Sequence, residues 1–150
     1  MKTLNLLTVI LASQFIASCS FIGTSSDVGK PFAKEMVTSF ILMDINALNE
    51  EIAKQAGISD TPLTIIIDLL KINSEQKELI IYQSFLSAEK RESVIVSVVR
   101  DGYLDDSVRG EWNEFEMRRN SGQVWKIINA KKAFLCWRLE SNQYQNKPCL

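Results

Sequence analysis

The chain has 150 residues, of which 46% are hydrophobic and 23% charged, with 17 basic residues against 18 acidic ones and no histidine. This apolar content is too high for a long disordered chain, and the even charge balance lacks the basic excess typical of a nucleic-acid binder. The length suits one domain with a core of its own. Without histidine, the chain lacks the usual acid–base group near neutral pH and the commonest metal ligand.

The N-terminal segment has the pattern of an export signal. Met1 and Lys2 give a short positive start, and residues 4–16 form a mostly apolar run. A stable transmembrane helix needs about 20 apolar residues, so this shorter run predicts a secretory signal rather than a permanent span.

The tetrapeptide Ile16-Ala17-Ser18-Cys19 ends the apolar run. It resembles the lipobox of bacterial lipoproteins, in which an aliphatic residue and two small residues precede a cysteine. The resemblance implies removal of residues 1–18 by signal peptidase II, acylation of Cys19 by chains such as palmitate, and a membrane anchor in the cell envelope. Serine follows Cys19 where aspartate would imply retention at the inner membrane, so the expected location is the outer membrane, facing the periplasm. The alternative is an ordinary signal peptide cut nearby, which leaves Cys19 as a plain thiol.

The segment after Cys19 has the composition of a flexible linker. Residues 19–29 are rich in serine, glycine and threonine, and we expect them to form a lipidated tether. Residues 30–150 then form a single domain.

If Cys19 carries lipid, the two remaining cysteines are Cys136 and Cys149. In an oxidising compartment we expect them to pair. A disulfide that closes so short a loop contributes about 3 kcal/mol in the chain-entropy account, and it would pin the polar C-terminal tail. The alternative is a reactive thiol, which needs an activating neighbour, and the residues around Cys136 form no recognisable catalytic motif.

The first half of the domain has helical periodicity. Apolar residues on steps of four predict one long helix over Lys30–Ala56, with Asp27 as its cap, Pro31 in its first turn and Gly57 after its end. A second, short helix is predicted from Asp60 or Thr61 through Leu70, with Pro62 at its first position. The β-branched run over residues 64–67 leaves a strand as the alternative for residues 61–72.

The second half has the character of a sheet. Four segments rich in β-branched and aromatic residues, separated by turn residues, predict strands over 78–86, 93–100, 108–119 and 123–138. Short connections predict an antiparallel meander. The strand over 93–100 is apolar on both faces, so we expect one face to pack on the long helix and the other to line a partly covered cavity. The expected fold class is α+β.

Helices followed by a long-stranded meander over residues 28–140 give a layout similar to the NTF2-like or cystatin-like folds. The segment over residues 110–149, GEWNEFEMRRNSGQVWKIINAKKAFLCWRLESNQYQNKPC, also resembles small bacterial envelope lipoproteins of unassigned role. The shared features are a Gly-Glu strand start, a tryptophan in the next strand and a Cys-Trp…Cys ending. This resemblance adds to the expected location and implies no activity.

Aromatic residues are the first candidates for a binding site. Trp112, Trp125, Trp137 and Tyr103 are candidate ligand-facing residues, because aromatic faces suit sugars and cationic head groups. Trp125 and Trp137 would share a face of one strand if no bulge intervenes. The alternative is that the tryptophans pack in the core or at the edge of the sheet.

Asp101, Asp105 and Asp106 lie in one loop. Clustered carboxylates can hold calcium, but the spacing of an EF-hand is absent, so we expect no metal. The simpler interpretation is a solvated hairpin loop in which Arg109 pairs with an aspartate.

The remaining candidates are carboxylates that could act as a catalytic pair, namely Asp44, Asp68, Glu111, Glu114 and Glu116. An enzyme acting on a cell-wall glycan would need two of them to converge within about 5–10 Å. Placement in ion pairs or on a solvent face accounts for the same residues. The sequence therefore predicts a non-enzymatic, lipid-anchored envelope protein that binds a protein or small ligand at the concave face of its sheet, without cofactor or nucleic acid. The alternative is the carboxylate-dependent enzyme. The sequence does not set the oligomeric state.

Overall fold

A computed structural model describes residues 34–54, 61–73, 76–121, 123–139 and 142–150. The predicted signal peptide, lipobox and tether lie outside these residues, as do Asp27, Pro31 and Gly57. The elements follow in the order of a 3-10 helix (Lys34–Met36), β1 (Ile41–Leu42), α1 (Ile45–Lys54), α2 (Pro62–Leu69), β2 (Glu78–Phe85), β3 (Ser93–Asp101), β4 (Val108–Arg119) and β5 (Trp125–Cys136). No helix within these ranges has the length and apolar content needed to span a membrane.

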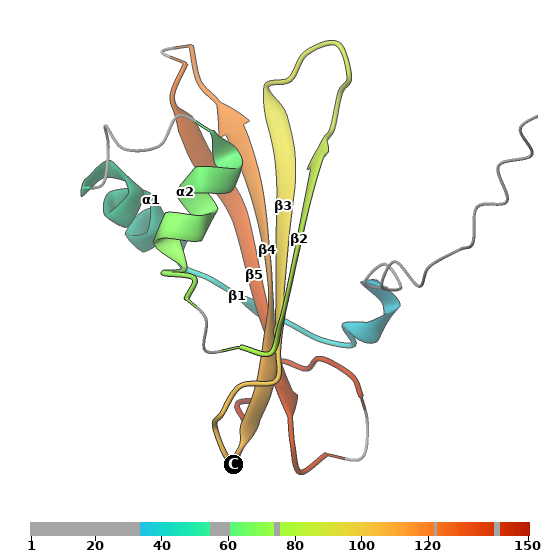
Figure 1. Cartoon of the computed structure of the whole chain (residues 1–150). Coiled ribbons are helices and arrows are strands. Elements are labelled where there is room, and N and C mark those ends of the chain that lie inside the picture. The colour runs from blue at the N-terminus through green and yellow to red at the C-terminus, as the bar shows by residue number, and fades with distance from the viewer. Residues whose placement is uncertain (1–33, 55–60, 74–75, 122, 140–141) are drawn as a thin grey trace, which may run out of the picture. The chain divides into compact units, whose positions relative to one another are not determined.

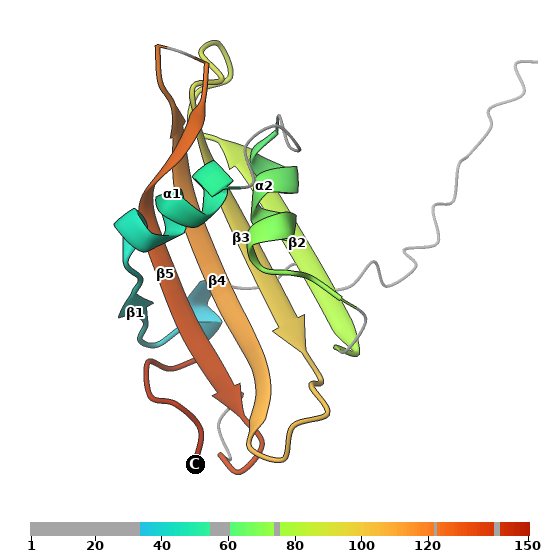
Figure 2. The ribbon, with the colours of Figure 1, turned by 90° about the vertical axis from the view of Figure 1, so that its left-hand side faces the viewer.

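The strands form one open antiparallel sheet in the order β1-β5-β4-β3-β2. Both helices lie against the same face of this sheet, as the two views in Figures 1 and 2 show. The predicted α+β class and the four-stranded meander are confirmed. The sequence did not predict β1, which adds a fifth strand beside β5.

The main core lies between the helices and the sheet. Side chains alternate across a strand, so every second residue of β3 points toward the helices. The buried members of this core come from α2 and three strands: Ile65, Ile66, Val94, Val96, Val98, Phe115, Met117, Trp125, Ile127 and Ala130. We call this side of the sheet the helix face and the other side the open face.

The open face carries a second, smaller core near the end of β3 that contains Val99. There Val99 and Trp112 pack with Tyr144 from the C-terminal tail, and Met36 and Val37 border them. The expectation that β3 is apolar on both faces is confirmed. Where a partly covered cavity was expected on this side, the tail places the aromatic ring of Tyr144, which is 2% exposed.

The prediction of one long helix over Lys30–Ala56 is wrong in the described residues. Only α1 is an α-helix there, and it begins after Asp44, whose carboxylate accepts hydrogen bonds from the backbone N–H groups of Asn46 and Ala47. Residues 37–42 do not continue a helix because partners from the far end of the chain bind them. Ile41 pairs with Lys132, and Val37 bridges Tyr144. Tertiary pairing has overridden the helical spacing of the apolar residues.

The ambiguity over residues 61–72 is resolved in favour of a helix. Thr61 caps α2 in a capping box, in which its side chain accepts from the N–H of Thr64 and the Thr64 side chain accepts from the N–H of Thr61. Pro62 occupies the first turn, where its missing N–H costs nothing. These start signals outweigh the strand preference of the isoleucine run.

The predicted disulfide between Cys136 and Cys149 is confirmed, with a Cα–Cα distance of 5.5 Å. It joins the end of β5 to the end of the tail. Between the two cysteines, the backbone N–H and C=O of Gln145 exchange hydrogen bonds with Phe134, at 2.8 and 2.9 Å. The tail therefore continues the sheet beside β5 in line with β1.

The outer edge of β5 is closed by a different partner at almost every outward-facing residue. The side-chain amide of Asn49 in α1 makes the pair of hydrogen bonds that a neighbouring strand would make. It donates to the carbonyl of Ile127 and accepts from the N–H of Ile127, both at 2.9 Å. The N–H of Met43 donates to Ala130, and β1 and Gln145 pair with the next positions. An edge that would otherwise offer free hydrogen-bonding groups is thus occupied.

Replacing Asn49 with alanine should expose this dependence. The Asn49→Ala variant leaves the N–H and C=O of the buried Ile127 without partners, so we expect the free energy of unfolding to fall by about 1–2 kcal/mol in urea denaturation. Asn46→Ala is the matched control, because Asn46 is on the same helix and no side-chain hydrogen bond to a described residue holds it. Equal stabilities of the two variants would contradict the bridging role of Asn49.

Candidate functional site

The three tryptophans do not form a common platform. Trp112 is 2% exposed on the open face, Trp125 is 4% exposed on the helix face, and Trp137 is 47% exposed beyond the end of β5. The condition for a shared face of Trp125 and Trp137 is not met, because the register of β4 and β5 shifts opposite Glu116 and Met117, leaving Ile128 as an extra residue. Each tryptophan therefore has its own surroundings.

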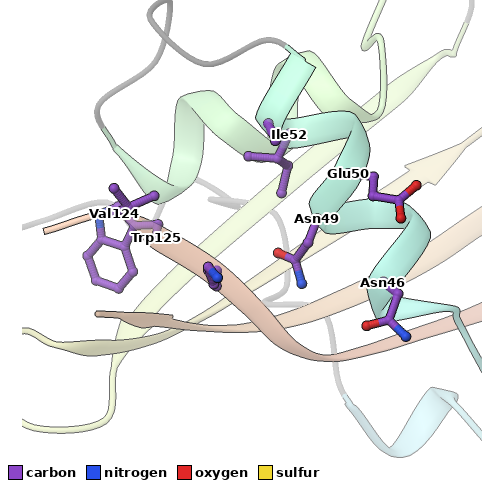
Figure 3. Close-up of a pocket in the computed structure, with 8 residues that line it drawn as sticks. Asn46, Asn49, Glu50, Ile52, Val124 and Trp125 are labelled. Carbon is purple, nitrogen blue, oxygen red and sulfur yellow. The ribbon is translucent and has the colours of Figure 1, made fainter. Parts of the chain in front are cut away.

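Trp125 lines a cleft of about 620 Å³ between α1 and the start of β5. Figure 3 shows that Asn46, Asn49 and Glu50 line it from the helix, while Trp125 and the preceding Val124 line it from the start of β5. The indole Nε1 of Trp125 is buried without a hydrogen-bond partner among the described residues, and Arg119 stacks on the ring at 4.9 Å. The side-chain amide of Asn49 is already hydrogen-bonded to Ile127. The surface that the cleft presents to a ligand is therefore mainly apolar.

Trp137 lines a second cleft, of about 590 Å³, at the end of the sheet. Its other lining residues come from the start of β2, the end of β3, the following connection and the start of β4: Lys77, Glu78, Asp101, Gly102 and Arg109. Gly102 has φ +75°, and a Cβ there would lie 2.5 Å from the Cβ of Lys77. Only glycine therefore allows the chain to turn this closely past Lys77.

Arg109 organises the wall of this cleft. Its Nε and one terminal nitrogen bind the two carboxylate oxygens of Asp101, each at 2.9 Å, and the other terminal nitrogen donates to Asn142 at 2.8 Å. The guanidinium also lies over the ring of Trp137, 5.4 Å from its centroid. The expected pairing of Arg109 with an aspartate is confirmed, and it identifies Asp101 as the partner. Two parallel hydrogen bonds to one carboxylate fix the orientation of the Arg109 guanidinium. The indole of Trp137 therefore packs against a cation whose position is fixed.

The rest of the loop is shaped by Asp105. One of its carboxylate oxygens accepts from the N–H and hydroxyl of Ser107 and from the N–H of Val108. These hydrogen bonds lower the pKa of Asp105 below its ordinary value. Within the residues that the structure describes, no three acidic or cysteine side chains gather in a way that could hold a metal ion.

Tyr103 lies beside an ion-pair network that crosses three strands on the helix face. Glu111 of β4 binds Arg100 of β3 through one carboxylate oxygen and Lys132 of β5, at 2.7 Å, through the other. The hydroxyl of Tyr103 donates to Glu111 at 3.5 Å, and its ring lies 5.6 Å from the Arg100 guanidinium. Asn113 adjoins this network and is 1% exposed, with its Nδ2 unpaired among the described residues.

The five candidate carboxylates are spread over both faces of the sheet and the helices. Glu111 is on the helix face, whereas Glu114 and Glu116 share the open face as their spacing predicts. Glu114 pairs with Lys131 at 2.9 Å. Asp44 caps α1, and Asp68 is exposed on α2. None of the five lines either of the two clefts.

Sequence reasoning missed several residues that shape these clefts. Asn49 interrupts an apolar stripe, and that interruption is the only signal of its role. Lys77 and Glu78 precede or begin a strand and carry no motif. Their partners are distant in the sequence, so no local pattern could have placed them.

No protein-family model, no curated protein and no solved structure matches the chain.

The buried tyrosine of the tail gives a test that uses pH. Burial, followed by the nearby charge of Asp101, raises the pKa of the Tyr144 hydroxyl above its ordinary value of 10. The unfolded chain loses this proton as the pH passes 10 while the folded chain keeps it, so the stability that it contributes is complete below pH 10 and declines above it. We expect the free energy of unfolding to drop more steeply between pH 10 and 11.5 in the wild type than in Tyr144→Phe, by up to about 1 kcal/mol per pH unit. Parallel curves for the two proteins would contradict burial of the hydroxyl.

Proposed function

We propose that the chain is a lipid-anchored protein of the bacterial cell envelope whose folded domain is a non-enzymatic binding module. The observation that carries the proposal is how the three cysteines are divided. Cys136 and Cys149 are paired, and Cys19 stands at the end of a lipobox. Disulfides persist in oxidising compartments, so the pair supports export of the domain, while the lipobox supports an anchor rather than free secretion.

A lipid anchor also removes any need for a membrane-binding surface on the domain. Each buried methylene contributes about 0.8 kcal/mol, so two or three acyl chains on Cys19 would hold the protein durably. Ser20 favours the outer membrane, with the domain in the periplasm. The layout shared with NTF2-like or cystatin-like folds is part of this proposal and assigns no ligand by itself.

The Trp137 cleft is the binding site that we propose. It combines a half-exposed indole, held by Arg109, with Lys77 and Glu78 at its rim. An aromatic face with charges of both signs suits a small polar ligand that has one apolar face, such as a sugar ring, or a cationic head group. The negative charge of Asp101 is balanced by its ion pair with Arg109. This pairing favours ligand binding over acid–base catalysis at the cleft.

Labelling of the acyl chains tests the anchor. Cells fed a tagged palmitate should label the wild-type chain, and mass spectrometry of its N-terminal peptide should find Cys19 acylated and residues 1–18 removed. The Cys19→Ser variant should carry no label, because serine offers no sulfur for the thioether. Cys149→Ser is the control and should label like the wild type. An unmodified Cys19 in the mature wild-type protein would overturn the anchor.

Capture of ligands tests the binding module. The purified full-length protein in detergent should retain a glycan fragment or an envelope component. Trp137→Ala should weaken that binding about five- to thirtyfold, since an aromatic contact that becomes buried on binding is worth about 1–2 kcal/mol. Leu104→Ala changes a residue that is 94% exposed in the neighbouring loop and should bind like the wild type. Turnover of a cell-wall glycan by the purified protein would instead support the carboxylate-dependent enzyme.

A further inference from the structure

The two edges of the sheet differ in how their hydrogen-bonding groups are used. At the β5 edge, β1, Met43, Asn49 and Gln145 bind the outward-facing residues. At the other edge, β2 is the last strand of the sheet. Figure 2 shows β2 as the outermost strand, with no further described strand beside it.

The hairpin register determines which groups of β2 face outward. The N–H of Leu86 donates to the carbonyl of Ser93, so even-numbered residues of β2 pair with β3 and odd-numbered residues point away. The outward residues are Leu79, Ile81, Gln83 and Phe85. In the part of the chain that the structure describes, nothing hydrogen-bonds their outward N–H and C=O groups.

The β2 edge also lacks the features that usually block strand addition. Its sequence, ELIIYQSF, contains no lysine and no proline, and its pairing with β3 runs through eight residues without a bulge. Its one charged residue, Glu78, is at the end. Apolar side chains are exposed along the edge, with Leu79 40%, Tyr82 36% and Leu86 55% accessible. An edge of this length and regularity is suited to binding another strand.

We propose that β2 pairs antiparallel with β2 of a second copy of the chain, so that two sheets join into one across a two-fold axis. The register that centres the axis on Tyr82 uses all four outward residues, because Leu79 then faces Phe85 of the second copy and Ile81 faces its Gln83. Each of these pairs exchanges two backbone hydrogen bonds. Shifting the register by two residues leaves one outward residue of each strand without a partner in β2.

Side-chain complementarity favours a second copy over an unrelated strand. Leu79, which is exposed in one copy, lies opposite Phe85, whose side chain packs against the helix-face core of the other. The two Tyr82 rings meet on the open face. Glu78 faces Leu86 rather than another carboxylate, so no like charges oppose each other in this register. The self-pairing therefore gives the two exposed apolar residues within β2, Leu79 and Tyr82, an apolar partner from β2 of the second copy.

Cysteine cross-linking tests the register directly. In the proposed dimer the two copies of residue 82 form a pair that is not hydrogen-bonded, with Cα atoms about 4.5 Å apart, which a disulfide can bridge. The full-length Tyr82→Cys protein, mildly oxidised in detergent, should run mostly as a covalent dimer on a non-reducing gel. Ser84→Cys is the matched control on the same strand and face. Its two copies would lie roughly 13 Å apart, because they are offset by four residues, and should not cross-link.

A second variant separates strand pairing from chance collision. Gln83→Pro in the Tyr82→Cys background removes an N–H that points away from β3, so the internal ladder remains while pairing across the edge is blocked. Cross-linking should then fall to the level of the protein without an engineered cysteine, and an unchanged circular dichroism spectrum would show that the domain stays folded. That parent protein also reports any dimer formed through Cys19, which keeps this test separate from the lipid anchor.

Three results would overturn the proposal. The first is a Tyr82→Cys protein that stays monomeric, and the second is equal cross-linking at residues 82 and 84. The third is a cross-link from residue 82 to a different protein, since the edge would then serve an unrelated strand.

Discussion

The outer side of β5 takes its hydrogen-bond partners from α1, from the segment around β1 and from the C-terminal tail, so this one strand edge holds three separate parts of the chain in place. Asn49 brings α1 to Ile127, Met43 leads the chain onto Ala130, and Gln145 folds the tail against Phe134. Each partner is a different structural device. Together they set the position of the first helix, the short β1 and the C-terminal tail relative to the meander, and therefore also the cleft between α1 and the start of β5.

The two faces of the sheet are filled by unlike means. On the helix face, α1 and α2 supply apolar side chains, and the ion pairs of Glu111 with Arg100 and Lys132 occupy the part of the sheet beyond them. On the open face, one tyrosine from the tail covers Trp112. The disulfide holds that tail close to β5, so a covalent bond supports the face that α1 and α2 do not cover. Arg109, at the same end of the sheet, then joins the tail through Asn142 to Asp101 and presents Trp137 to solvent.

What the sequence could predict was local, and what it missed depends on distant partners. The strands β2 to β5 were predicted close to their true bounds, because apolar alternation and turn residues are encoded within each hairpin. Residues 37–42 were expected to be helical, since their apolar spacing fits a helix and the strand that binds them is far away in the sequence. In the candidate site, the Arg109–Asp101 pair was within reach of local reasoning. The bulge at Ile128, which separates Trp125 from Trp137, has no glycine or other marker in the sequence.

The bridge between Val37 and Tyr144 joins the two ends of the domain. The hydroxyl of Thr38 donates to the carbonyl of Tyr144, 106 residues further along the chain. The meander from β2 to β5 consists of neighbouring hairpins that can pair as soon as they have been synthesised. Residues 36–38 emerge long before Tyr144, and so they bind it only after the last segment of the domain has been made. Assembly of the domain therefore finishes at its first residues. A chaperone that binds the nascent chain would have to cover these residues for longer than any other part of the domain.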